Sequence, residues 1–173
     1  STSGSVVWIT GLSGAGKSTL ARAVVAILRE QSTPTVLLDG DEVREVFGSV
    51  VASSDNHGRQ ARMRHGLQYG ALCRLISRQG INVVMATISM FREVHAWNRE
   101  NLPSYTEVFL RVPFEELRRR DPKQIYQRYD AGEITDVPGL AVGYTTLIEG
   151  EGDLVVGEGP IRTPHQGVVW PSN

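Results

Sequence analysis

The sequence has little of what marks secreted, membrane or nucleic-acid-binding proteins. Its 173 residues include one cysteine, Cys73, which excludes a disulfide framework within the chain. No apolar run approaches the roughly 20 residues that a membrane-spanning helix needs. The polar start, STSGS, lacks the charged-then-apolar order of a signal peptide. A formal net charge of −1 gives no global basic field for a nucleic acid polymer. We therefore expect a cytoplasmic protein without membrane or nucleic acid partners, and a buried, structural Cys73.

The remaining composition is that of one globular domain spanning residues 1–173, with 40% hydrophobic and 21% charged residues. Short apolar runs predict strands at 6–10, 35–38, 81–87 and 106–112, and helical patterns follow at 18–30, 42–47, 58–78, 91–101 and from Pro113. Gly66 and Gly70 weaken the long helix. Strands that alternate with helices indicate a three-layer α/β fold with a mostly parallel sheet. For the Gly- and Pro-rich end we expect an edge strand at 153–156 and an irregular tail at 157–173.

The strongest motif is GLSGAGKS at residues 11–18, which fits G-x-x-x-x-G-K-[ST]. Its glycines let backbone N–H groups surround phosphate oxygens, and the next helix points its positive end at them. Lys17 adds a charge at the β- and γ-phosphates, and the Ser18 hydroxyl can hold Mg²⁺. The predicted nucleotide contacts are Gly11, Ser13, Gly14, Ala15, Gly16, Lys17, Ser18 and Thr19. The alternative is a Gly-rich turn that merely joins two elements, but the strand before and the helix after it favour a P-loop NTPase or kinase fold that binds ATP or GTP.

Two acids, Asp39 and Asp41, follow the second predicted strand in the segment DGDEVR. Ligands of open α/β sheets bind outside the carboxyl ends of the strands, so both acids should lie near the phosphate loop. One can assist Mg²⁺, and the other can accept a proton from an attacking hydroxyl. The alternative is a helix cap with first-turn acids.

Arginines are scattered beside the expected loop ends, at Arg44, Arg59, Arg62, Arg64 and Arg92. Arginine suits two-point recognition of phosphate or sulfate, although most surface arginines are simply solvated. Arg92 is the best candidate, because it ends the segment ISMFR that follows the third strand.

The segment RRRDPK at residues 118–123 begins a charged helix pair flanked by proline and glycine. This pattern suits a mobile helical lid over about 118–140, which would exclude water and bring cations to the phosphoryl group. A solvated helical face is the alternative. We expect Tyr126 to be a packing residue.

Taken together, these segments resemble the adenylylsulfate (APS) kinase family. The similarity is collinear over about residues 5–140 and is carried by residues 8–19, 38–44, 86–92, 120–126 and 131–134. It implies that ATP phosphorylates the ribose 3′-hydroxyl of adenylylsulfate, with Mg²⁺ as cofactor, and a homodimer is the assembly it suggests.

The resemblance also implies residue roles. Asp41 would be the base, beside Asp39, Lys17 and the lid residue Lys123, with Ser18 and Asp39 holding the metal. The implied acceptor contacts are Asp41, Arg44, Arg59, Arg62, Ile88, Ser89, Arg92, Lys123 and Val137.

Departures from the family pattern concentrate in the part that recognises the acceptor base. The usual Phe-Ser pair after the second motif is missing, Arg62 replaces an Asn, and Val137 stands where a lid Phe is usual. Two lost ring faces remove stacking worth about 1–3 kcal/mol per base. Cytidine diphosphoramidate kinases, which also resemble APS kinases, therefore remain an alternative. A non-catalytic nucleotide-binding module is a third alternative. A GTPase-like switch would need a guanine-reading Asn-Lys-x-Asp segment, which this sequence lacks.

Overall fold

The computed structural model describes residues 2–48, 59–134, 137, 161–162 and 167–170. A central sheet has the strand order β2-β3-β1-β4-β6-β5, and every pair but β5–β6 is parallel. The strands are β1 (Val6–Gly11), β2 (Thr35–Asp39), β3 (Asn82–Ala86), β4 (Tyr105–Leu110), β5 (Ile161–Arg162) and β6 (Gly167–Trp170). The predicted α/β fold with a mostly parallel sheet is confirmed.

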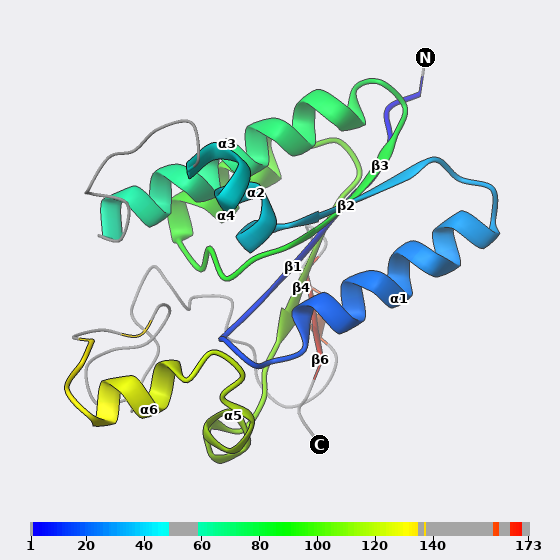
Figure 1. The fold of residues 1–173 in the computed structure, drawn as a ribbon. Coiled ribbons are helices and arrows are strands. Elements are labelled where there is room, and N and C mark those ends of the chain that lie inside the picture. The colour runs from blue at the N-terminus through cyan, green and yellow to red at the C-terminus, as the bar shows by residue number, and fades with distance from the viewer. Residues whose placement is uncertain (1, 49–58, 135–136, 138–160, 163–166, 171–173) are drawn as a thin grey trace.

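Helices cover both faces of the sheet (Figure 1). They are α1 (Lys17–Glu30), α2 (Gly40–Gly48), α3 (Arg59–Ser77), α4 (Arg92–Asn101), α5 (Phe114–Arg120) and α6 (Ile125–Asp130). On one face, α3 and α4 bury Trp8 and Met85, and on the other α1 buries Ile9 and Val84. This alternation follows from the two-residue period of a strand. A third cluster packs α5 and α6 against Leu12 and Phe109, beside the phosphate loop.

The prediction of an irregular tail at 157–173 was wrong, because β5 and β6 lie within it. Strand β6 (GVVW) pairs with β4 in parallel, with Val168 opposite Val108. Four residues carry too little periodicity to reveal a strand among glycines and prolines, and the exposed edge of β4 supplies its pairing partner. The edge strand expected at 153–156 lies outside the described residues.

The two glycines that weakened the long-helix prediction are explained by the close approach of α3 and α4. A Cβ at Gly66 would lie 2.8 Å from Val94, and one at Gly70 would lie 2.3 Å from Asn98 Oδ1. Only a bare Cα fits at both positions. One turn apart, the pair makes a flat face that accepts α4, while Cys73 of the same helix is fully buried. Burial raises the pKa of the Cys73 thiol to about 12, as expected of a structural cysteine.

In the part of the chain that the structure describes, none of the helices has both the length and the apolar character that crossing a bilayer requires.

We expect Gly70→Ala to lower the free energy of unfolding by about 1–3 kcal/mol, because the added methyl group overpacks the α3–α4 contact. Alanine's better helix propensity offsets only part of this cost. Gly48→Ala is the matched control, since a Cβ there meets nothing within 4 Å. Urea denaturation of both variants measures the effect, and equal midpoints would contradict this account of α3.

Candidate active site

The loop between β1 and α1 has the conformation of a phosphate cradle. Gly14 and Gly16 have φ angles of 83° and 96°, which side-chain-bearing residues rarely adopt. Gly16 is the N-cap of α1 and forms no side-chain cap, so the first amides of the helix remain available to an anion. Lys17 reaches back across the loop, and its Nζ donates to the Leu12 carbonyl at 3.0 Å. The predicted strand–loop–helix context of the motif is therefore present.

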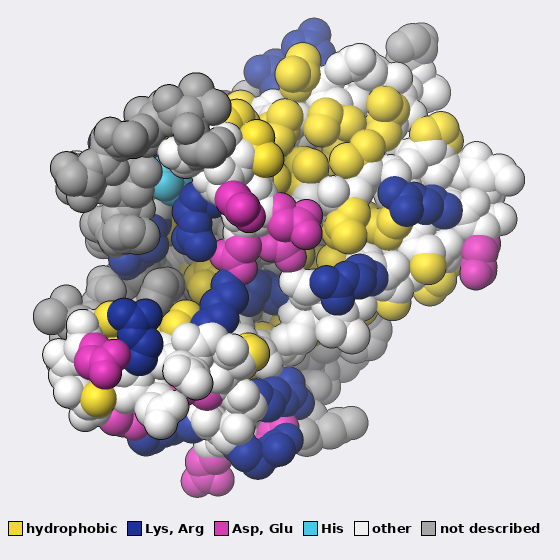
Figure 2. All heavy atoms as spheres, in the orientation of Figure 1, with side chains coloured by type: hydrophobic (Ala, Val, Ile, Leu, Met, Phe, Trp, Pro, Cys, Tyr) yellow, Lys and Arg dark blue, Asp and Glu magenta, His cyan; other side chains and the backbone are white. Residues whose placement is uncertain are grey.

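A cleft of about 450 Å³ opens beside this loop. Its walls come from the loop and the start of α1, the start of α2, one side of α3, residues 86–91 and the lid segment. On the face shown in Figure 2, acidic side chains gather near the centre, with basic side chains beside them. This mixture suits anionic ligands that are held by cations while a carboxylate handles a proton.

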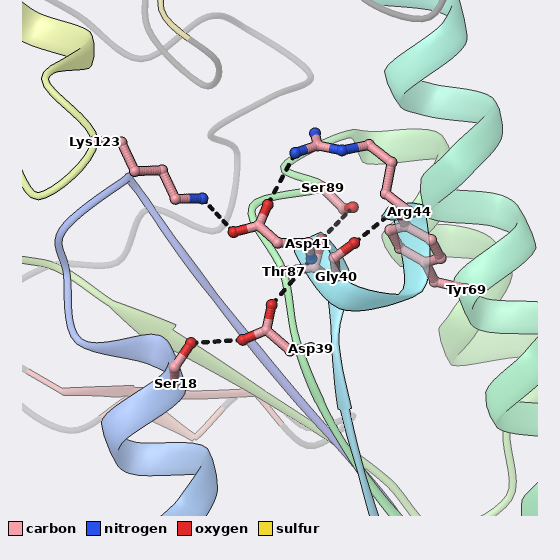
Figure 3. A network of polar contacts seen from close by, with 9 residues as sticks. All are labelled: Ser18, Asp39, Gly40, Asp41, Arg44, Tyr69, Thr87, Ser89 and Lys123. Atoms are coloured by element: carbon pink, nitrogen blue, oxygen red, sulfur yellow. Dashed lines mark hydrogen bonds and ion pairs between the residues drawn. The ribbon is translucent and has the colours of Figure 1, made fainter. Parts of the chain in front are cut away.

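Asp39, the last residue of β2, joins the two sides of the cleft (Figure 3). Its Oδ2 accepts a hydrogen bond from Ser18 Oγ at 2.6 Å, and its Oδ1 accepts one from the Asp41 amide at 3.0 Å. The Ser18–Asp39 pair offers two oxygen ligands side by side, the donor type that Mg²⁺ prefers. These residues fit a Mg²⁺ ion that also binds nucleotide phosphates. Among the described residues, no group of three or more His, Cys, Asp or Glu side chains forms a separate metal site.

Two cations hold the Asp41 carboxylate. Arg44 donates to its Oδ1 at 3.0 Å, and Lys123 from the lid segment pairs with its Oδ2. Burial works to raise the pKa of Asp41, but the hydrogen bond from Lys123 and the charges of Lys123, Arg44 and Lys17 outweigh it and lower the pKa. Asp41 is therefore ionised at neutral pH and can accept a proton.

The pKa of Lys17 is shifted by its surroundings. Burial, and then the charge of Lys123, lower the pKa of Lys17 from 10.5 to about 8, against the opposing charges of Asp41 and Asp39. Because burial disfavours the charged form of Lys17, a bound phosphate stabilises this ammonium group more than it would a fully solvated one.

Helices α5 and α6, which include the start of the predicted lid, are docked on the phosphate loop. Tyr126 donates its hydroxyl to the Ser13 carbonyl at 2.9 Å, and Arg120 donates to the Gly14 carbonyl at 3.2 Å. Tyr126 is buried and meets Phe114 edge to face, so it packs as expected. Its hydroxyl also fastens α6 to the loop, a contact between residues 113 positions apart in sequence that no local pattern indicates.

The predicted acceptor residues are only partly brought together. Asp41, Arg44, Arg62, Ile88, Ser89 and Lys123 line the cleft. Arg92 begins α4 with an exposed side chain and is not among the lining residues, and Val137 is buried against Met90 and Tyr126. Arg59 begins α3, and its side chain lies outside the described part, as does the loop before it. Arg64 is exposed on α3.

One wall of the cleft is the side of α3 that carries Arg62, His65 and Tyr69, of which the sequence analysis identified Arg62 and missed His65 and Tyr69. The His65 and Tyr69 rings stack with their centroids 6.4 Å apart. Their spacing of three and four residues places all three on one helix face. That periodicity was available in the sequence, and together with Arg62 it could have indicated His65 and Tyr69 as neighbours on the cleft side of α3.

Comparison with known proteins agrees with this geometry. The family model described as adenylylsulphate kinase matches residues 3–154. An adenylyl-sulfate kinase of Vibrio vulnificus is 39% identical over 155 residues, covering 88% of this chain and 73% of the relative. A cytidine diphosphoramidate kinase of Campylobacter jejuni is 33% identical over 151 residues, covering 87% and 84%. The structure of a Mycobacterium tuberculosis APS kinase in complex with AMPPNP and APS superposes with a TM-score of 0.74 at 26% identity, covering 98% of this chain and 90% of that one.

The lowered pKa of Lys17 predicts how nucleotide affinity depends on pH. Phosphate oxygens favour protonated Lys17, so ATP·Mg²⁺ affinity should be constant below pH 8 and should weaken by up to about tenfold per pH unit above it. Calorimetry near pH 9 in two buffers of different ionisation enthalpy should show proton uptake on binding. Lys123→Gln removes a like charge and should move the onset to higher pH. Absence of proton uptake would contradict the assignment.

Proposed function

This chain belongs to the adenylylsulphate kinase family, and from that premise we propose that it transfers the γ-phosphoryl group of ATP to the ribose 3′-hydroxyl of a nucleotide conjugate. Adenylylsulfate is the first candidate acceptor, and the products would be 3′-phosphoadenylylsulfate and ADP. The observation that carries the proposal is Asp41, an ionised carboxylate two residues after Asp39 of the Ser18–Asp39 pair and inside the same cleft as the phosphate loop.

The proposed division of labour follows the geometry of the cleft. The phosphate loop and Lys17 hold the β- and γ-phosphates. Ser18 and Asp39 hold Mg²⁺, which when bound neutralises charge on the phosphates. Asp41 accepts the proton of the acceptor hydroxyl as that oxygen attacks the γ-phosphorus in line.

Lys123 has two places to act. Without acceptor it pairs with Asp41. An acceptor hydroxyl that reaches Asp41 competes for the same carboxylate oxygen, and the displaced ammonium group is then free to stabilise the transferring phosphoryl group. Arg44 remains as the second cation beside the base and can contact the anionic part of the acceptor.

A cytidine diphosphoramidate acceptor is the second candidate, and the α3 wall favours it. Arg62 lines the cleft where the resemblance led us to expect an Asn, with His65 beside it on the same helix, and the two Phe residues usual for stacking the acceptor base are absent. The loss of the ring faces suits a base smaller than adenine, and Arg62 can still bind an anionic oxygen of the acceptor. The expected homodimer and cytoplasmic location remain predictions.

We expect Asp41→Asn to lower kcat at least about 100-fold, because the amide cannot accept a proton. The KM for ATP should stay within about twofold, since Asp41 is placed on the acceptor side of the cleft. Asp130→Asn is the matched control, because Asp41 and Asp130 are 51% and 43% exposed and each forms an ion pair, with Asp130 joined to Arg118. A near wild-type kcat for Asp41→Asn in a coupled ADP-release assay would show that another group is the base.

The acceptor is identified by measuring ADP release from ATP·Mg²⁺ with adenylylsulfate or cytidine diphosphoramidate. We expect turnover of at least one, with a 3′-phosphorylated product in the ³¹P spectrum. Turnover of the cytidine compound alone would reject the first candidate and assign the α3 wall to a different acceptor. Turnover of neither, with ATP still bound, would reject kinase activity on both acceptors and leave a nucleotide-binding module.

A further inference from the structure

Tyr69 belongs to the core and to the cleft at once. Its ring is 4% exposed and packs in the cluster of Trp8 and Met85 between α3 and the sheet. Its hydroxyl points the other way and donates to the Gly40 carbonyl at 3.1 Å (Figure 3). Gly40 is the first residue of α2 and directly precedes Asp41. A residue 29 positions away therefore holds the peptide that carries the proposed base.

The start of α2 is restrained from three directions. On the side of the phosphate loop, Asp39 accepts a hydrogen bond from the Asp41 amide. Thr87, after β3, lies so close that a Cβ at Gly40 would be 2.9 Å from its Oγ1. Tyr69 supplies the third restraint, from α3. Thr87 in turn is hydrogen-bonded to Ser89 at 2.8 Å, so the surface that supports Gly40 is itself fixed.

The side chain of Asp41 needs such support. It is half exposed, and its side-chain partners within the described ranges, Arg44 and Lys123, are long and also half exposed. Long side chains at a surface hold position weakly because they retain rotamer freedom. The backbone at residues 40–41 therefore decides where the carboxylate lies, and a displacement of about 1 Å at a reacting group can cost about 100-fold in rate.

We propose that Tyr69 is a positioning residue for the phosphoryl transfer, acting through the Gly40 carbonyl to hold Asp41 at the acceptor hydroxyl. The kinetic part of this inference rests on the proposed function, and the structural part does not. In this hydrogen bond the Tyr69 hydroxyl is the donor, because a carbonyl oxygen can only accept. Burial raises the pKa of the Tyr69 hydroxyl, and Asp41 and Asp39 add to that rise against the charge of Arg44, so the hydroxyl stays protonated and donates throughout the working pH range.

Tyr69→Phe removes the hydroxyl and leaves the buried ring. Tyr105→Phe is the matched control: Tyr105 is 2% exposed in the same core cluster, and its hydroxyl is hydrogen-bonded to Asn98 at 3.2 Å. Tyr105 begins β4, at the end of the sheet away from the cleft, and is not among the residues that line it. Any effect of removing a buried tyrosine hydroxyl as such appears in both variants.

The kinetic test uses whichever acceptor the wild-type enzyme phosphorylates. We expect Tyr69→Phe to lower kcat about tenfold with the KM for ATP within about twofold, and Tyr105→Phe to leave kcat unchanged. In an Asp41→Asn background, Tyr69→Phe should lower kcat no further, because two residues that act through one group are not additive. A wild-type kcat for Tyr69→Phe, equal losses in both tyrosine variants, or full additivity with Asp41→Asn would overturn the proposal.

Hydrogen–deuterium exchange of the intact protein tests the positioning without any acceptor. Peptides that cover α2 should exchange several-fold faster in Tyr69→Phe, while peptides from α1 and β1 stay unchanged, and Tyr105→Phe should leave α2 at the wild-type rate. Unchanged exchange of α2 in Tyr69→Phe would overturn the proposal even if the enzyme is active. If the wild-type protein phosphorylates neither acceptor, the proposed function fails, and this measurement alone decides whether Tyr69 holds α2.

Discussion

The carboxylate of Asp39 is the link on which the rest of the site depends. One oxygen accepts from Ser18 at the start of α1, and the other accepts the amide of Asp41 in α2. Asp39 ends β2 and pairs with Ala86 in the sheet, so its position is set by the most rigid part of the molecule. The nucleotide side and the acceptor side are thereby held in one fixed relation, which phosphoryl transfer requires because it depends on alignment more than on covalent chemistry.

Around this link, the charges of the cleft balance one another internally. Asp39 and Asp41 lie among Lys17, Arg44 and Lys123, and the pKa values of Lys17 and Asp41 are both lowered. Burial opposes each charge, and the neighbouring cations further oppose that of Lys17 while favouring that of Asp41. In the proposed reaction, anionic substrates replace these internal pairs with their own oxygens. Lys123 illustrates the exchange, because it pairs with the carboxylate oxygen of Asp41 that we propose for the acceptor hydroxyl.

Helix α3 connects the core to the cleft through the placement of small and large residues. Gly66 and Gly70 allow α4 to approach one face, Cys73 and the Tyr69 ring fill the core, and the Tyr69 hydroxyl reaches α2. In the sequence alone, the two glycines lower the helix propensity of the segment. In the packed structure the close contact between the helices compensates for that loss, and the same packing sets the position of Tyr69 opposite Gly40.

The sequence by itself determined the parallel α/β fold, the phosphate loop and the acids after β2, because each depends on residues close together in the chain and on the rule that parallel strands end at one edge of the sheet. It did not reveal strand β6 within the tail, the place of His65 and Tyr69 beside Arg62 on the cleft wall, or the docking of Tyr126 on Ser13. Those features join segments far apart in sequence, and a short strand or a single hydroxyl carries no local pattern of its own. Only tertiary packing decided them, because each feature is formed by a contact with a residue on another element of the fold.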